Sequence, residues 1–171
     1  MEKSALKAAI WAAFDDVSYP GDDNIGILGG RDDAKRVTEW YRGVDWRSLT
    51  PDTIWSFGLS WMTPEAFHYY LPAYLLAPID DGADAYEFTL NSLTPPFACT
   101  DYPQNYKDHF QNIVDIMTLP QKRAIQDFLL FNLEEAIELQ KTDESPDFYD
   151  SEIKQLRFAL EYWGQALKDE R

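Results

Sequence analysis

The sequence TPEAFHYYLPAYLLAPI, residues 63–79, is the strongest indication of the fold class of this chain. Thr63 has a side chain that caps helices, Pro64 suits the first helical position, and Glu65 supplies the negative charge that a helix N-terminus favours. The stretch therefore predicts a helix that begins at this Thr-Pro-acid start. Its continuation is the longest apolar run in the chain.

The apolar part of this stretch, Phe67 to Ile79, is too short to span a bilayer and contains two prolines. Pro72 lacks the amide that would bond to the carbonyl of His68 in a helix. We therefore expect a kink or an early stop at Pro72. We also expect a soluble protein.

Apolar residues at helical spacing predict two helices before this stretch. The first ends at Asp15-Asp16, and the second starts near Arg31 and stops at Gly43. Thr50-Pro51-Asp52 repeats the Thr-Pro-acid pattern, so we expect a further helix to begin there.

Four more helices are expected after residue 79. Segment 83–93 carries apolar residues on one face, and Thr94-Pro95-Pro96 ends it. Apolar residues from Tyr106 to Met117 mark the next helix, and Pro120 opens another. The last helix has an apolar stripe at 3-4-3-4 spacing: Ile153, Leu156, Leu160, Trp163 and Leu167.

No segment shows the sustained alternation of apolar and polar residues that is typical of a strand. The length of 171 residues fits one domain. We therefore predict an all-α fold, a single compact domain over residues 1–171 with about six to eight helices and little or no sheet. The C-terminal stripe is expected to pack inside this bundle, although it could instead pair two copies of the chain through Trp163 and Leu167.

The chain is strongly acidic, with 30 Asp and Glu against 15 Lys and Arg and a formal net charge of -15. Nucleic acids and anionic membranes favour a basic surface, so direct binding to either is not expected. A hydrophobic fraction of 45% argues against a disordered acidic tail. The single cysteine, Cys99, excludes an intramolecular disulfide, and no signal peptide is expected, so we predict a cytoplasmic protein.

Charge is unevenly distributed, because residues 48–106 contain seven acids and no Lys or Arg, together with twelve of the 26 aromatic residues. One interpretation places these aromatics in the core and the acids at helix ends and in loops. The other places some of both on one surface, since interfaces use aromatic anchors within a polar rim. The candidate partner-binding residues are Asp80, Asp81, Asp84, Glu87, Asp101, Trp55, Trp61, Tyr86 and Tyr102.

Motifs for catalysis or metal binding are incomplete. Glu65 and His68 have the Glu-x-x-His spacing of di-iron bundles, but the other histidine, His109, lacks an acid three residues before it. Cys99 and His109 would form a nucleophilic pair only if the fold brought them together. The glycine-rich run 26–30 matches no phosphate-binding pattern, so its glycines are expected to shape a turn. We predict no catalytic residue, no metal ligand and no cofactor.

Two stretches resemble a known family. They are residues 9–23 and residues 45–75, and the second contains the phrase Thr-Pro-Glu-Ala-Phe-x-Tyr-Tyr-Leu-Pro-Ala. Both are similar to a widespread bacterial family of small, uncharacterised helical proteins, and the resemblance covers residues 1–80. It implies a bacterial origin and a helical fold. Because the family has no established activity, it implies no catalytic residue.

These observations lead to one main hypothesis and two alternatives. We expect a non-enzymatic bacterial protein that binds and neutralises a basic partner protein, such as a toxin, as an immunity or antitoxin-type inhibitor does. Its acidic surface would steer the partner through its long-range field, or would imitate DNA in the partner's nucleic-acid-binding groove. The alternatives are a small enzyme or metal-dependent protein that uses carboxylates with His68, and a structural or adaptor protein that acts as a homodimer.

Overall fold

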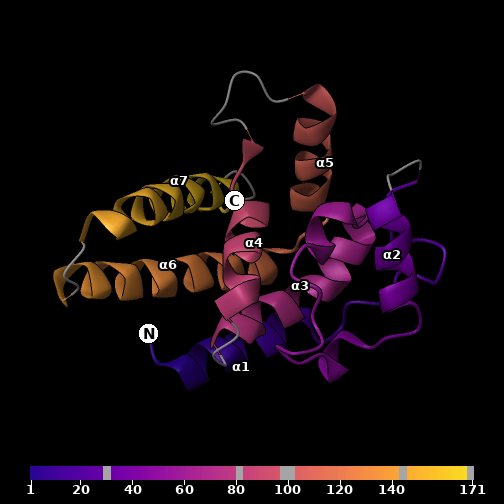
Figure 1. Cartoon of the computed structure of the whole chain (residues 1–171), viewed down its shortest axis with the longest axis horizontal. Coiled ribbons are helices and arrows are strands. Elements are labelled where there is room, and N and C mark those ends of the chain that lie inside the picture. The colour runs from indigo at the N-terminus through magenta and orange to yellow at the C-terminus, as the bar shows by residue number, and fades with distance from the viewer. Residues whose placement is uncertain (29–31, 80–82, 97–102, 143–145, 169–171) are drawn as a thin grey trace.

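The computed structural model describes residues 1–28, 32–79, 83–96, 103–142 and 146–168, and these residues contain seven α-helices and no strand (Figure 1). The predicted all-α fold is therefore confirmed. The α-helices are α1 (Lys3–Phe14), α2 (Asp32–Tyr41), α3 (Pro64–Ile79), α4 (Ala83–Leu93), α5 (Gln104–Asp115), α6 (Leu119–Thr142) and α7 (Asp150–Ala166). Short 3-10 helices are η1 (Trp46–Ser48), η2 (Gly58–Trp61) and η4 (Pro146–Tyr149).

The central helix is α3, which contacts α1, α4 and α5 (Figure 1). Thr63 caps it as predicted, because its Oγ1 accepts a hydrogen bond from the amide of Ala66 at 3.2 Å. The same hydroxyl donates to the carbonyl of Asn24 at 2.8 Å, which ties the start of α3 to the segment before α2.

The prolines of α3 do not end it. The helix continues through Pro72 and Pro78 to Ile79, so of the two outcomes expected at Pro72, a kink or an early stop, the early stop does not occur. Eleven of the 16 residues of α3 are buried, and burial on nearly every side outweighs the cost of about 3 kcal/mol for an internal proline. Among the described residues no helix, α3 included, has the length and apolar character needed to cross a membrane.

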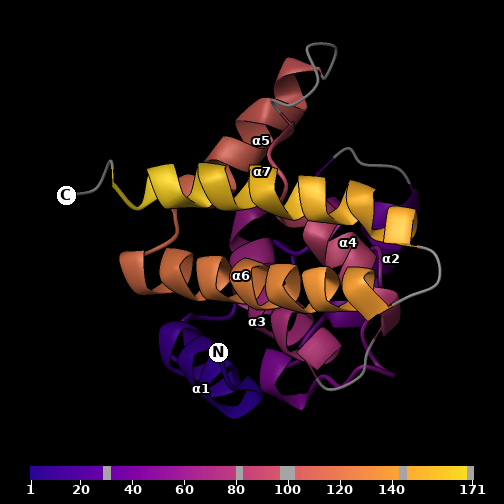
Figure 2. The same cartoon turned by 90° about the vertical axis from the view of Figure 1, so that its left-hand side faces the viewer.

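The two longest helices, α6 and α7, lie side by side, as Figures 1 and 2 both show. The stripe on α7 faces the interior, where Ile153, Leu156 and Trp163 are buried. Trp163 Nε1 donates to the carbonyl of Leu93 at 2.9 Å. The structure thus uses the stripe inside the chain, and Trp163 is not available to pair two copies.

The helix predicted to begin at Thr50 is wrong, because only a single turn forms there. The amides three and four residues later both donate to the carbonyl of Thr50, at 2.9 and 3.1 Å. Tyrosine side chains form hydrogen bonds with the backbone groups that follow. The Trp55 amide donates to the Tyr41 hydroxyl at 3.0 Å, and the Tyr74 hydroxyl donates to the Trp55 carbonyl at 2.7 Å. These tertiary hydrogen bonds compete with helix propagation, and the local sequence does not contain them.

Other predicted boundaries agree closely with the structure. Segment 83–93 is α4. α2 ends at Tyr41, and Gly43 then has φ of +68°, the left-handed conformation that commonly follows a helix. Gly26 lies so close to α2 that a Cβ would be 2.2 Å from the carbonyl oxygen of Ala34, so only glycine fits this approach.

Candidate interaction surface

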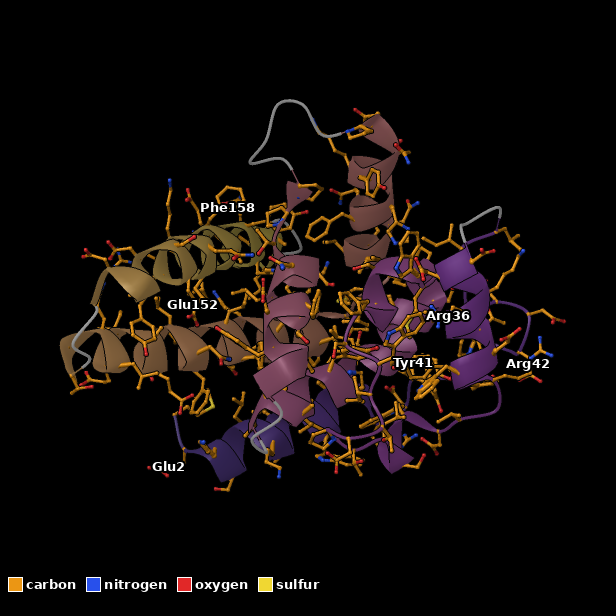
Figure 3. All side chains as sticks on the ribbon, viewed as in Figure 1. Glu2, Arg36, Tyr41, Arg42, Glu152 and Phe158 are labelled. Atoms are coloured by element: carbon orange, nitrogen blue, oxygen red, sulfur yellow. The ribbon has the colours of Figure 1, made fainter. Side chains whose placement is uncertain are left out.

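A network of buried tyrosine hydroxyls holds the segment between α2 and α3. The hydroxyls of Tyr41 and Tyr74 lie 2.7 Å apart, and the Tyr70 hydroxyl donates to the carbonyls of Tyr41 at 2.7 Å and Val44 at 3.0 Å. Figure 3 shows Tyr41 between the two helices. Burial raises the pKa of Tyr41, Tyr70 and Tyr74, so all three hydroxyls keep their protons at neutral pH and can donate. The network therefore positions the segment that carries Trp55.

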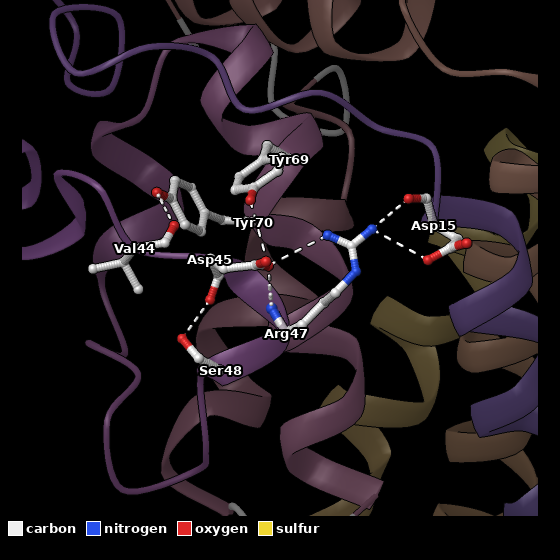
Figure 4. Close-up of polar contacts among 7 residues, drawn as sticks. All are labelled: Asp15, Val44, Asp45, Arg47, Ser48, Tyr69 and Tyr70. Carbon is white, nitrogen blue, oxygen red and sulfur yellow. Dashed lines mark hydrogen bonds and ion pairs between the residues drawn. The ribbon is translucent and has the colours of Figure 1, made fainter.

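A second polar cluster joins η1 to the end of α1 (Figure 4). The Arg47 guanidinium lies between Asp15 and Asp45, with nitrogen–oxygen distances of 3.2 and 3.3 Å, and it also donates to the Asp15 carbonyl. The pKa of Asp45 lies below its ordinary value, mainly because its carboxylate accepts a hydrogen bond from the Arg47 amide. The guanidinium lies 4.8 Å from the Trp46 ring centroid, which packs this cluster against the core.

Four aromatic side chains with exposed or half-buried rings come from α2, from the segment before η2 and from α4, and both helices contact η2. We call these four side chains the aromatic face: Trp40, Trp55, Phe57 and Phe88. The ring centroids of Phe57 and Phe88 are 4.1 Å apart, and Trp40 Nε1 donates to the carbonyl of Thr53 at 3.0 Å. Trp40 is 56% exposed and Phe57 49%. Exposed apolar side chains that contact one another, as Phe57 contacts Phe88, mark interaction sites more often than a single exposed side chain does.

Three exposed acids are close in the sequence to residues of the aromatic face. Glu39, Asp52 and Glu87 each lie within three positions of one of its residues in the sequence, and all three are exposed. Within the described part of the chain none of the three forms an ion pair. The guanidinium of Arg36, labelled on α2 in Figure 3, lies 5.8 Å from the Trp55 ring centroid. The face thus combines aromatic rings, one of which already carries a cation, with unpaired negative charge.

The structure places the predicted partner-binding residues in different surroundings. Trp55 belongs to the aromatic face, and Glu87 is one of the three exposed acids close to it in the sequence. Trp61 is half-buried against the core, and the Tyr86 hydroxyl donates to Glu152 Oε1 at 2.6 Å, which ties α4 to α7. Asp84 lies in α4, but its side chain is outside the described part. The remaining predicted residues lie outside the described ranges: Asp80, Asp81, Asp101 and Tyr102.

Sequence analysis missed three residues of the aromatic face. Trp40 could have been found from helical spacing, because it lies off the apolar face of its predicted helix. That face consists of Ala34, Val37 and Tyr41. Phe57 and Phe88 carry no comparable signal, since their contact joins segments that are distant in the sequence.

Other aromatics of the window 48–106 belong to the core. Phe67, Tyr69, Tyr70 and Tyr74 on α3 are at most 5% exposed. The interpretation that places the aromatics of this window in the core therefore holds for those on α3. The second interpretation is restricted to the region around Trp55.

Glu65 and His68 do not form a unit. His68 Nε2 lies 2.8 Å from Gln121 Oε1, whereas Glu65 is exposed and its charge acts on His109. Burial lowers the pKa of both histidines, so both imidazoles are neutral at pH 7. Within the described ranges no three His, Cys, Asp or Glu side chains are grouped so that they could hold a metal ion. Cys99, the other half of the suggested nucleophilic pair, lies outside those ranges.

The chain belongs to a family of unknown function, DUF6714, whose sequence model matches residues 2–167. This match confirms membership of an uncharacterised family and covers nearly the whole chain. The bacterial origin and the diagnostic value of residues 63–73 stay predictions. No curated protein and no solved structure matches the chain.

Proposed function

We propose that this member of the family is a non-enzymatic protein that binds and neutralises a basic partner protein through the aromatic face, in the manner of an immunity or antitoxin protein. One observation carries the proposal. The half-exposed rings of Trp40 and Phe57 are held by the Trp40–Thr53 hydrogen bond and the Phe57–Phe88 contact. The exposed acids Glu39, Asp52 and Glu87, close to these aromatics in the sequence, form no ion pair within the described residues.

Exposed aromatic rings supply binding energy to a partner rich in Lys and Arg. A cation over a Trp or Phe ring contributes about 0.5–1 kcal/mol at an exposed site and about 2 kcal/mol when the contact is desolvated. Arg36 over Trp55 is an example of this contact within the chain. Trp is also among the residues that dominate binding hot spots, which makes Trp40 the leading anchor of the proposed interface.

Net charge favours the same class of partner. A formal charge of -15 attracts basic proteins over long range and accelerates their association. Salt screens this attraction, because the Debye length falls from about 30 Å at 0.01 M to about 3 Å at 1 M ionic strength. The proposed complex should therefore form more slowly, and bind more weakly, as the salt concentration rises.

The aromatic face is also ordered before any partner arrives. Tyrosine hydroxyls bond both backbone groups of Trp55, and the Thr53 carbonyl accepts from the Trp40 indole. Few side chains would have to lose conformational freedom on binding, so more of the contact energy would appear as affinity.

The test is a calorimetric titration of the purified chain against the proteins encoded by the genes that flank its own, at about 50 mM and about 500 mM salt. We expect binding that weakens with salt and that falls at least about tenfold in Trp40→Ala. Leu139→Ala is the matched control, because Leu139 is 50% exposed but lies on α6, away from the aromatic face.

The outcomes separate clearly. Wild-type affinity in Leu139→Ala together with loss in Trp40→Ala supports the aromatic face as the interface. No binding, binding that ignores salt, or equal losses in the two variants would overturn the proposal.

A further inference from the structure

A hollow of about 560 Å³ lies between η2, α3, α4, α5 and α7. In Figure 1, α5 and α7 lie on either side of α4. Its apolar lining includes Leu59, Phe67, Phe110 and Ile113. The volume falls within the range of about 300–1,000 Å³ that is typical of small-molecule sites, and a cavity of about 150 Å³ already holds one benzene. No residue of the aromatic face lines this hollow.

The described lining of the hollow has no charged side chain, although 26% of the chain is Asp, Glu, Lys or Arg. A charged ligand would lose its hydration there without gaining a partner of opposite charge. The lining therefore selects for an uncharged molecule.

Two polar groups of the lining have no partner within the described part of the chain. The half-buried imidazole of His109 makes no hydrogen bond there, and the hydroxyl of Ser92 is buried and unpaired. Burial lowers the pKa of His109, against an opposing effect of the Glu65 charge, so the ring is neutral and offers one donor and one acceptor. Buried polar groups are normally paired, so the Ser92 hydroxyl indicates a missing hydrogen-bond partner, and the half-buried His109 ring lines the same hollow with its own nitrogens open to a ligand.

The wall opposite α5 is already fixed. Gln155 on α7 donates to Asn91 Oδ1 at 2.8 Å and to Thr94 Oγ1 at 3.0 Å, which joins α7 to the end of α4. A ligand would enter a pre-formed hollow and would not have to order this wall.

We propose that the hollow binds an uncharged, ring-containing organic molecule larger than a single ring, which buries its apolar part against Phe67, Phe110 and Ile113 and hydrogen-bonds to His109. This small-molecule site is independent of the partner surface proposed above.

The test compares three bicyclic probes of nearly equal size by NMR titration of the full chain. 2-Naphthol carries a hydroxyl, 2-methylnaphthalene replaces it by a methyl group, and 2-naphthoate carries a negative charge. We expect 2-naphthol to bind about fivefold more tightly than 2-methylnaphthalene because of one hydrogen bond to His109, and 2-naphthoate to bind most weakly.

Three variants locate the binding. His109→Phe keeps an aromatic ring in the wall and should remove the preference for 2-naphthol while 2-methylnaphthalene still binds. Ile113→Trp fills the hollow and should abolish binding of both. Ala12→Trp fills a separate hollow between α1 and α6 and should leave all three affinities unchanged.

Equal affinity of 2-naphthol and 2-methylnaphthalene for the wild type would overturn the proposal. So would a preference for 2-naphthol that survives in His109→Phe, or tightest binding by 2-naphthoate. Because His109→Phe changes only a half-buried ring, the test does not depend on whether Ile113→Trp folds. The result also leaves the partner-binding proposal untouched, since none of these variants alters the aromatic face.

Discussion

Replacing Tyr74 by Phe removes one hydroxyl from the tyrosine network and leaves the ring in place. That hydroxyl donates to the Trp55 carbonyl at 2.7 Å and lies 2.7 Å from the Tyr41 hydroxyl. Because the Tyr74 proton is used on Trp55, the Tyr41 hydroxyl must donate its own proton to Tyr74, while it accepts from the Trp55 amide at 3.0 Å. Tyr74→Phe therefore leaves the Tyr41 proton without a partner, whereas the Trp55 carbonyl keeps the hydrogen bond that it accepts from the Gly58 amide at 2.8 Å.

The expected loss in the free energy of unfolding is about 1–3 kcal/mol. Each buried polar group that loses its partner costs about 1–3 kcal/mol. Tyr41 and Tyr74 are both 0% exposed, so no water can replace the acceptor that the Tyr41 proton loses, whereas the Trp55 carbonyl stays bonded to the Gly58 amide. A loss of this size is a large share of the roughly 5–15 kcal/mol that stabilises an ordinary domain.

Urea unfolding, followed by tryptophan fluorescence and circular dichroism, measures this loss at an unchanged m value. Tyr162→Phe is the matched control, because its hydroxyl makes an exposed contact of 3.4 Å with Gln111 and its loss should cost less than about 0.5 kcal/mol. If Tyr74→Phe costs no more than this control, the network does not hold the segment at Trp55. The argument that the aromatic face is pre-ordered would then fail as well.

Two further predictions concern glycine and histidine positions. Gly26→Ala should destabilise the chain by about 1–3 kcal/mol, because the new methyl group would lie 2.2 Å from a backbone oxygen of α2. Gly164→Ala within α7 should be neutral or stabilise by up to about 1 kcal/mol, since only the flexible Gln126 amide lies near, at 3.2 Å; equal effects of the two changes in thermal denaturation would contradict this contrast. His68 and His109 should both titrate below the ordinary value of 6.5, because burial lowers their pKa. Unfolded histidines bind protons more readily, so their contribution to stability falls as the pH drops below about 6.5, and an NMR titration midpoint at or above that value for either ring would refute the prediction.

Thr50 and Thr63 show how far local patterns reach. Both open a Thr-Pro-acid sequence, and both receive hydrogen bonds from amides three or four residues later. After Thr63 the chain continues as a largely buried helix of 16 residues. After Thr50, tyrosine hydroxyls form hydrogen bonds with the backbone amide and carbonyl of Trp55 instead. The same start signal therefore nucleates a turn in both places, and distant side chains decide whether the turn is extended.

The prolines of α3 make the complementary point. The early stop expected at Pro72 follows correctly from the missing amide, but the side chains that surround α3 supply more free energy than the proline costs. Neither the number of these neighbours nor their identity can be read from residues 63–79 alone.

Short-range information was sufficient for the positions of most helices, the cap at Thr63 and the sign of the net charge. These properties depend on residues within about one helical turn, or on a sum over the chain, and they do not require knowledge of which segments meet. The tertiary structure alone brought Phe57 against Phe88 and placed the ring of His109 in the lining of a hollow. Those arrangements rest on contacts between residues far apart in the sequence, whose free energies no local pattern contains.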